Sequence, residues 1–398
     1  MKLFGDSNSD SDDKKGDVGK ERIEGKISRY KVAIVSTNTS LVEKIRSVLV
    51  LYNIIRIQVF DVEFSALREK VKLDEFDVVL IDINQNKDVE FISAYLTQYI
   101  PVDCIAYVLG DNDSISFAYE LEKKGIKYLL NDIQLDNLPM LLWEGKNKES
   151  KRQGNIITFL GCKGGVGTSY LAYNTVRGIY ALSKIPILFI QGASGSSDID
   201  FIVEEPVEKD GSIVQLKNNI SVRVEPVETS WNYKDDSTSK FNLIVFDHNL
   251  NNNLSISQLN NVFLSSNSVI VVINRDPYSI KIAKSIIEER GRIVARDEGV
   301  ADKRFFICLN DNHPFSKKEM LSDEDIEEFL ERKIDIKQRY YPSQKKLKDG
   351  VTSKDIKGIA TLLIGIDEQY NSRHSEQVEN KDKKSLFSFI KLKKDNKE

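Results

Sequence analysis

The chain has 398 residues, enough for two or three domains, and 40% of them are hydrophobic, enough for ordinary packed cores. Its formal net charge of −4 excludes a global basic field of the kind that attracts nucleic acid. The isolated cysteines Cys104, Cys162 and Cys308 exclude a disulfide framework and a zinc cluster. Because the sequence also lacks a secretory leader and an apolar run of roughly eighteen residues, we expect a cytoplasmic protein without a membrane span.

Residues 1–29 are rich in Ser, Asp and Lys, and we expect them to form a flexible arm. From Tyr30 onward, short β-branched runs alternate with amphipathic stretches, which predicts a parallel sheet covered by helices. In residues 30–145 the expected strands are KVAIVS, IRIQVF, FDVVLIDI, DCIAYVLG and IKYLLN. Five strands with intervening helices indicate a flavodoxin-like, receiver-like domain.

A charged, apolar-poor linker at 146–154 precedes a second, larger alternation at 155–364. Its expected strands are NIITFLGC, PILFIQ, SVRVE, FNLIVFD, SVIVVIN and RFFICLN. We therefore predict an α/β protein with two doubly wound domains, the second with a mainly parallel sheet. Residues 365–398 form a polar, Lys-rich tail.

A glycine-rich turn lies between the strand IITFLGC and the helix SYLAYNTVRGIYALS. It comprises Lys163, Gly164, Gly165, Val166, Gly167, Thr168 and Ser169. Glycines let the backbone wrap closely around phosphates, and the following helix supplies N–H groups and a favourable dipole. We predict that this loop binds ATP, and the alternative is a strand-to-helix turn without a ligand.

The segment KGGVGTS resembles the deviant Walker A motif of the MinD/ParA superfamily. By that resemblance, Lys163 is the signature lysine that reaches across a homodimer to the partner's ATP, and the Ser169 hydroxyl binds Mg²⁺. The second lysine of the motif is replaced by Thr168, which removes a positive charge that ordinarily faces the β- and γ-phosphates.

Two further strands end on polar residues that fit the same superfamily. Asp247 ends FNLIVFD as the carboxylate of a Walker B strand does, and we expect it to hold Mg²⁺ together with Ser169. Asn310 ends RFFICLN, where the resemblance implies an asparagine that hydrogen-bonds adenine.

The Asp-x-Asp pair that the superfamily carries after the strand PILFI is replaced here by Gln191 and Ala193. Asp198 and Asp200 lie nearby, and a turn or capping role explains them at least as well as a catalytic one. Because Thr168 and Ala193 both remove charged groups of phosphoryl transfer, we predict ATP binding with weak or no hydrolysis.

The amino-terminal alternation resembles a response-regulator receiver domain, with Asp82 where the phosphoacceptor ends the third strand. The other residues of that site are replaced, by Thr37 and Asn38 for the acidic pair, Gly110 for the Thr or Ser, and Asn131 or Asp132 for the lysine. Phosphoryl transfer to Asp82 needs Mg²⁺ held by the acidic pair. We therefore expect a pseudo-receiver that serves for contacts.

A pseudo-receiver followed by a lysine-poor MinD-like ATPase resembles, over residues 30–364, the TadZ/CpaE family of Flp (Tad) pilus assembly proteins. The resemblance implies a localisation and assembly factor, a nucleotide-dependent homodimer that works with the pilus secretion machinery at the pole or the inner membrane. The alternatives are a ParA-like partition ATPase that binds DNA, a receiver-regulated switch and a scaffold without nucleotide. The loss of the lysine at Thr168 and the net charge argue against the DNA-binding class.

The tail segment KKSLFSFIKLKK, at 383–394, interleaves aliphatic and aromatic residues with five lysines. Such a composition can lie on an anionic bilayer. A disordered solubilising tail and a peptide that docks on a protein are the alternatives.

Overall fold

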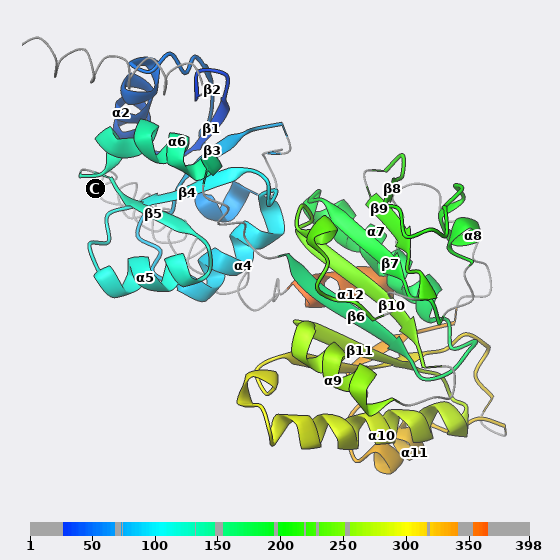
Figure 1. Ribbon diagram of the computed structural model, residues 1–398. Coiled ribbons are helices and arrows are strands. Elements are labelled where there is room, and N and C mark those ends of the chain that lie inside the picture. The colour runs from blue at the N-terminus through cyan, green and yellow to red at the C-terminus, as the bar shows by residue number, and fades with distance from the viewer. Residues whose placement is uncertain are drawn as a thin grey trace, which may run out of the picture.

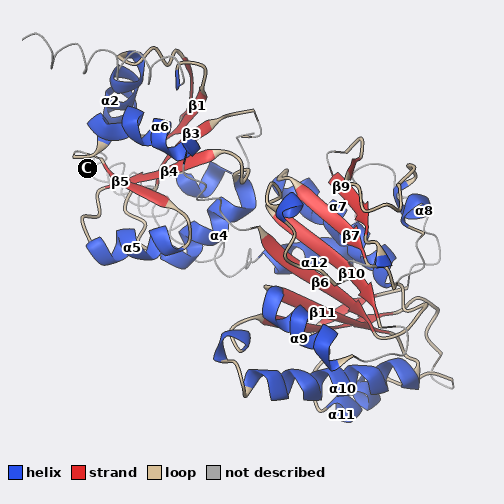
Figure 2. Ribbon diagram, in the orientation of Figure 1, coloured by secondary structure: helices blue, strands red, loops and turns tan. Residues whose placement is uncertain are grey.

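The computed structural model describes residues 27–67, 73, 75–131, 133–147, 154–194, 198–218, 220–227, 231–250, 255–316, 319–340 and 353–364. These residues form two predominantly parallel sheets, each with helices on both faces (Figures 1 and 2). The predicted fold class, two doubly wound α/β layers with the larger sheet second, is confirmed.

The first sheet has the strand order β2-β1-β3-β4-β5, all parallel. Its strands are β1 (Lys31–Val35), β2 (Arg56–Phe60), β3 (Val78–Asp82), β4 (Ile105–Gly110) and β5 (Lys127–Leu130). Its helical elements are α2 (Thr39–Val50), η1 (Phe64–Ala66), α4 (Val89–Tyr99), α5 (Ile115–Lys123), η2 (Leu135–Asn137) and α6 (Leu138–Asn147). The order is that of flavodoxin-like folds, as the sequence indicated.

Helices cover this sheet on both faces, which explains why its central strands read as continuous apolar runs. Side chains of α4 and α5 pack in one cluster, and those of α2 and α6 pack in another. The second cluster also contains Ile27, which is fully buried. The expectation of a flexible arm reaching residue 29 is therefore wrong at its end, because the side chain of Ile27 fills this core. Residues 1–26 lie outside the described part of the chain.

The second sheet has the order β13-β12-β11-β6-β10-β7-β9-β8. Its strands are β6 (Asn155–Gly161), β7 (Ile187–Gln191), β8 (Val214–Gln215), β9 (Ile220–Val224), β10 (Leu243–Asn249), β11 (Ser268–Ile273), β12 (Arg304–Asn310) and β13 (Ile336–Gln338). Strand β8 pairs antiparallel with β9, and the other described pairs are parallel. The sequence analysis did not predict β8 and β13, which are the shortest strands and lie at the two edges.

The helical elements around the second sheet are α7 (Thr168–Ser183), α8 (Ile199–Val203), η4 (Asp236–Thr238), α9 (Ile256–Ser265), α10 (Pro277–Val294), η5 (Glu298–Val300), α11 (Asp323–Leu330) and α12 (Lys354–Ile364). Helices α7 and α12 share one core cluster, and α9, α10 and α11 share the cluster on the opposite face. Gly178 permits the close contact of α7 with α12, since an added Cβ would lie 3.1 Å from the Ala360 side chain. The helix that follows the phosphate loop is therefore fixed by a second helix.

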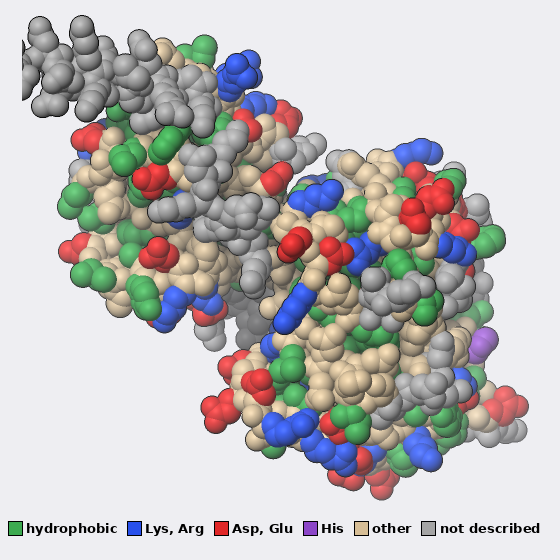
Figure 3. All heavy atoms as spheres, in the orientation of Figure 1, with side chains coloured by type: hydrophobic (Ala, Val, Ile, Leu, Met, Phe, Trp, Pro, Cys, Tyr) green, Lys and Arg blue, Asp and Glu red, His purple; other side chains and the backbone are tan. Residues whose placement is uncertain are grey.

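The two sheets meet where α4 ends and β10 begins. The buried Asn242 amide accepts a 2.9 Å hydrogen bond from the Val102 backbone and donates to the carbonyls of Thr97 and Ile100. Gln98 donates to the carbonyl of Ile364 at the end of α12. Acidic and basic side chains are interspersed over both lobes on the face in Figure 3. No helix in the described ranges is long and apolar enough to cross a membrane.

Candidate phosphate-binding site

The glycine-rich loop lies at the carboxyl end of β6, which β11 and β10 flank in the second sheet. The loop leads directly into α7, whose N-cap is Gly167. Ligands of parallel α/β sheets bind at this edge, where the strand ends meet helix N-termini. The fold thus gives the sequence motif the strand-loop-helix setting that the prediction required.

The backbone of the loop depends on two glycines with positive φ, Gly165 at 79° and Gly167 at 82°. Residues with a side chain rarely adopt this backbone region, so glycine is required for the turn. An added Cβ at Gly167 would also lie 2.5 Å from the Asn310 amide, whereas one at Gly164 or Gly165 would meet nothing within 4 Å. The loop is therefore tight towards the protein and open towards the outside, as a phosphate cradle must be.

Thr168 occupies the position where the superfamily motif has its second lysine. Its side chain is buried, and its Oγ1 has no hydrogen-bond partner among the described residues. A buried hydroxyl without a partner is costly unless a ligand or water satisfies it. A phosphate oxygen in the cradle would do so, and the residues present therefore fit a phosphate group.

Ser169 and Asp247, the expected Mg²⁺ ligands, are brought together by the fold. Ser169 lies close enough to Asp247, a residue of β10 that is 3% exposed, for its hydroxyl to lower the pKa of that carboxyl. The pKa of the Asp247 carboxyl is raised to about 7, chiefly by burial and also by the charge of Asp198, while Ser169 acts to lower it. A cation would stabilise the ionised form of this carboxylate, so the pair fits Mg²⁺.

No group of three His, Cys, Asp or Glu side chains in the described ranges could hold a metal alone.

Asn310 lies beside the loop at the end of β12. Its amide nitrogen donates to the Val166 carbonyl at 2.8 Å, and Asn312 donates to the Gly165 carbonyl at 2.7 Å. Both asparagines thus bind loop carbonyls, which leaves loop N–H groups for a ligand. The expected contact of Asn310 with adenine stays a prediction.

Gln191, which replaces the first residue of the Asp-x-Asp pair, is fully buried. Its amide donates to Asp198 at 3.2 Å and accepts from the Ile199 backbone at 3.2 Å. Asp198 stands at the N-cap of α8 without a side-chain capping bond, so Gln191 performs part of the capping role. The charge of Asp198 acts on Asp247, so this carboxylate lies near the site, and sequence spacing alone did not decide that.

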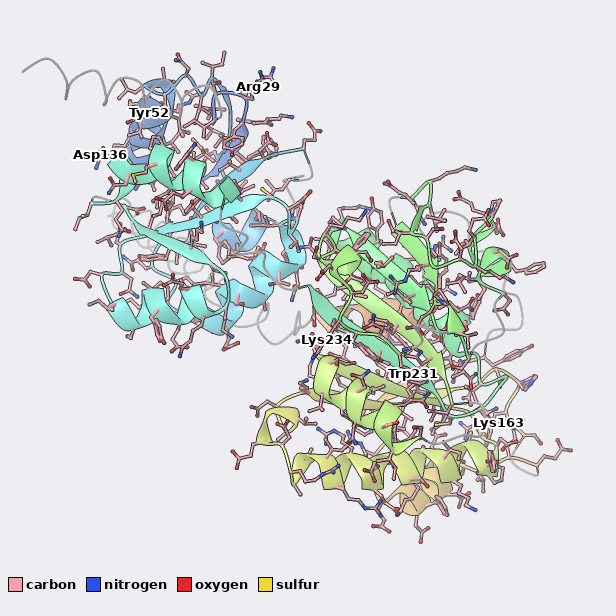
Figure 4. All side chains as sticks on the ribbon, viewed as in Figure 1. Arg29, Tyr52, Asp136, Lys163, Trp231 and Lys234 are labelled. Atoms are coloured by element: carbon pink, nitrogen blue, oxygen red, sulfur yellow. The ribbon has the colours of Figure 1, made fainter. Side chains whose placement is uncertain are left out.

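Lys163 binds a residue that the sequence analysis did not single out. Its ammonium lies 2.9 Å from Asp276, and both side chains are partly exposed. Asp276 also caps α10 by accepting from the Tyr278 backbone at 2.9 Å, which fixes its position. Figure 4 shows Lys163 beside the start of α10. The signature-type lysine is therefore held within its own chain.

A buried aromatic stack behind Asp247 was also missed. The His248 ring stacks on Trp231 with centroids 3.8 Å apart and an interplanar angle of 13° (Trp231 is labelled in Figure 4). Burial lowers the pKa of His248 to about 3, so the ring is neutral, and burial also raises the pKa of the nearby Glu225. A histidine next to an aspartate in a buried strand was the only sequence signal for this stack.

Asp82, at the end of β3, has a different environment. It accepts hydrogen bonds from the Ser36 hydroxyl at 2.7 Å and the Asn84 backbone at 2.8 Å, and it is 4% exposed. The space above Gly110 is filled by the Tyr128 hydroxyl, which would lie 2.9 Å from an added Cβ. The carboxylate is enclosed by its own domain.

The other positions compared with a receiver site in the sequence also make internal contacts. Asn38 caps α2 by accepting from the Leu41 backbone, the Thr37 hydroxyl donates to Glu63, and the Asn131 amide donates to Asp111. Asp132 lies outside the described residues.

No protein-family model matches the chain, and no curated protein matches it. Similar solved structures include a ParA family ATPase from Chlorobium tepidum, at 14% identity, 48% coverage of this chain, 85% of that chain and a TM-score of 0.35. MinD from Aquifex aeolicus has 18% identity, 53% and 98% coverage and a TM-score of 0.36. MinD from Pyrococcus furiosus has 16% identity, 54% and 100% coverage and a TM-score of 0.38. These similar structures are P-loop ATPases of the MinD and ParA type, and each aligns with about half of the present chain.

Proposed function

We propose that the chain binds ATP and Mg²⁺ at the loop 163–169 and acts as a nucleotide-dependent dimer with weak or no hydrolysis. The observation that carries the proposal is the buried, unpartnered Thr168 hydroxyl at the start of α7, which follows a glycine loop that is open at Gly164 and Gly165. Ser169 and Asp247 lie next to it. Loop N–H groups and the start of α7 would hold the phosphates, while Ser169 and Asp247 would hold the metal. Because position 168 holds threonine instead of lysine, Mg²⁺ would have to neutralise the phosphate charge in that part of the loop.

Weak hydrolysis follows from what surrounds the cradle. Thr168 supplies a hydroxyl where an ammonium would stabilise developing charge, and Gln191 uses its amide on α8. Asp198 is the carboxylate left to orient water. Turnover should therefore be slow.

The test is calorimetric titration of the full chain with ATP, in the presence of Mg²⁺ and in the presence of a chelator. We expect saturable binding with Mg²⁺ and at least tenfold weaker binding without it. An absence of binding in both buffers would refute the proposal and favour a scaffold without nucleotide.

The dimer proposal depends on Lys163, whose ammonium would leave Asp276 to contact the nucleotide of the partner subunit. With an enclosed Asp82, the amino-terminal domain would act as a pseudo-receiver that makes contacts only. This combination supports the TadZ/CpaE-type role, in which the dimer helps to place the secretion machinery of an Flp (Tad) pilus from the cytoplasmic side. Co-purification with pilus-system components, with and without ATP, would test that role.

Nucleic acid is not an expected partner, because the net charge is −4 and charges of both signs are interspersed on the surface in Figure 3. Filter binding with nonspecific duplex DNA at two salt concentrations checks this expectation. Tight binding with a steep salt dependence would favour a partition ATPase instead.

An anionic membrane is the other proposed partner, through the tail segment 383–394, which lies outside the described residues. Flotation with anionic vesicles should be greater for the full chain with ATP than for a chain that ends at residue 380. Two tails on one dimer would bind more tightly than one.

A further inference from the structure

Strand β5 (Lys127–Leu130) forms an edge of the first sheet, where it pairs with β4 on one side. Along its other side runs a groove of about 660 Å³ between α5 and α6. Figure 1 shows these two helices on opposite faces of the sheet with β5 between them. Its lining includes Ala118, Ile126, Leu129, Met140 and Leu141. An edge strand at the base of an apolar groove is suited to strand addition.

The charged residues that line the groove are Glu122, Glu144 and Lys127, so its lining carries a net negative charge. Glu122 and Glu144 both line it, and neither makes a salt bridge with a described residue. Glu144 lies close enough to Tyr107 for its charge to act on that phenol. The side chain of Gln134 occupies the end of the strand by accepting from the Leu130 backbone at 2.9 Å. The groove is therefore bounded at one end, partly apolar, and lined by charged residues whose net charge is negative.

We propose that residues 383–394 of the same chain dock into this groove as an added strand beside β5. In an extended conformation Leu386, Ile390 and Leu392 point to one face, suited to the apolar part of the lining. The five lysines of the segment provide the positive charge that the two lining carboxylates lack.

The segment can reach the groove from the last described residue. The carbonyl of Ile364 accepts a hydrogen bond from Gln98 on α4, so this point of the chain lies against the same domain that carries β5. Residues 365–382 span up to roughly 60 Å when extended, at about 3.3 Å per residue. A domain of about 100 residues has a radius of gyration near 13 Å, so the span is sufficient. Tethering raises the effective concentration of the segment to roughly millimolar, which favours it over a separate peptide.

Docking would withhold the apolar residues of the segment from a bilayer. The groove and an anionic membrane then compete for residues 383–394. Occupation of the groove by another ligand would release the tail.

The experiment uses a fluorescent peptide of residues 383–394 and the chain that ends at residue 380. We expect saturable binding by fluorescence anisotropy, and at least tenfold weaker binding to Met140→Asp, because that side chain is 56% exposed in the groove. Glu122→Lys/Glu144→Lys should weaken binding by several-fold at low salt. The control is Ile115→Asp, a change at an 86% exposed residue of α5 that does not line the groove, and it should bind like the parent chain.

The full chain should bind the peptide at least tenfold more weakly than the truncated chain, because its own tail occupies the site. Thermal unfolding of each variant checks its fold, and the exposed position of Met140 makes unfolding of that variant unexpected. Equal binding by Met140→Asp and Ile115→Asp would overturn the proposal, and so would equal binding by the full and truncated chains. Peptide that binds only to anionic vesicles would also overturn it.

Discussion

Each sheet of this protein carries a buried aspartate on a central strand, Asp82 at the end of β3 and Asp247 near the end of β10, and the two have different surroundings. Asp82 is enclosed by hydrogen bonds from Ser36 and Asn84. Asp247 has Ser169, a neighbouring carboxylate and a pKa raised to about 7. Asp82 thus has its hydrogen bonds from its own domain, whereas Asp247 would be stabilised in its ionised form by a cation.

We expect the largest effect on ATP affinity from a change at Gly167, because this residue forms part of the glycine-rich loop of the second sheet. Gly167→Val should reduce ATP affinity by roughly a hundredfold or more, since a side chain there is strained and contacts Asn310. Calorimetry with Mg²⁺ measures the loss. Gly291→Ala, in an open position on α10, is the matched glycine control and should bind ATP normally. Equal ATP affinities of Gly167→Val and Gly291→Ala would show that the glycine-rich loop is not the ATP site.

The variants Asp247→Asn and Asp82→Asn test whether only the aspartate of the second sheet contributes to ATP binding. The first should weaken Mg²⁺-dependent ATP binding about tenfold or more, and the second should leave it unchanged, because Asp82 lies in the other sheet. The same titration measures both. If Asp82→Asn lowered ATP affinity as much as Asp247→Asn, the assignment of the metal ligand would be wrong.

The raised pKa of Asp247 predicts the direction of a pH effect on stability without nucleotide and Mg²⁺. The folded state holds this proton up to about pH 7, whereas an unfolded aspartate loses it near pH 3.9. The contribution of Asp247 to the free energy of unfolding therefore falls as pH rises from about 4 to 7, by on the order of a few kcal/mol. Urea unfolding at several pH values should show a smaller fall for Asp247→Asn. A steeper fall for that variant would contradict the assignment.

A smaller effect is expected from the ion pair of Lys163. Lys163→Ala should remove the ATP-dependent part of self-association, while Asp276→Asn should preserve or strengthen it because asparagine still caps α10 and no longer retains the ammonium. Sedimentation velocity with and without ATP measures the dimer. If both variants dimerised as the parent chain does, Lys163 would have no role between subunits.

The smallest expected effect concerns the junction of the sheets. Asn242→Ala removes hydrogen bonds to Thr97, Ile100 and Val102, and should speed cleavage in the predicted linker 146–154 by several-fold. Limited proteolysis should then leave a nucleotide-binding fragment that starts near residue 154. A stable fragment that ends within 160–300 would contradict the predicted division.

The predictions from sequence were best where local pattern and burial agree. Long β-branched runs such as those of β6, β10 and β12 marked the buried parallel strands because both faces of such strands are covered. The two-residue β8 carries no such pattern. The predicted end of the arm lies beyond the buried Ile27, because a single apolar residue in a polar segment shows no hydrophobic periodicity.

The sequence by itself determined the glycine loop, its position between strand and helix, and the strand end at Asn310, since these depend on residues close in the chain. The expected strand end at Asp247 is wrong, because β10 continues to Asn249. Only the tertiary structure decided that Asp276 holds Lys163, that Gln191 binds Asp198, and that His248 stacks on Trp231. Those partners come from different strands and loops of the sheet. Their pairing depends on strand order and on burial, which changes the pKa and hydrogen-bonding needs of each group, and linear spacing encodes neither.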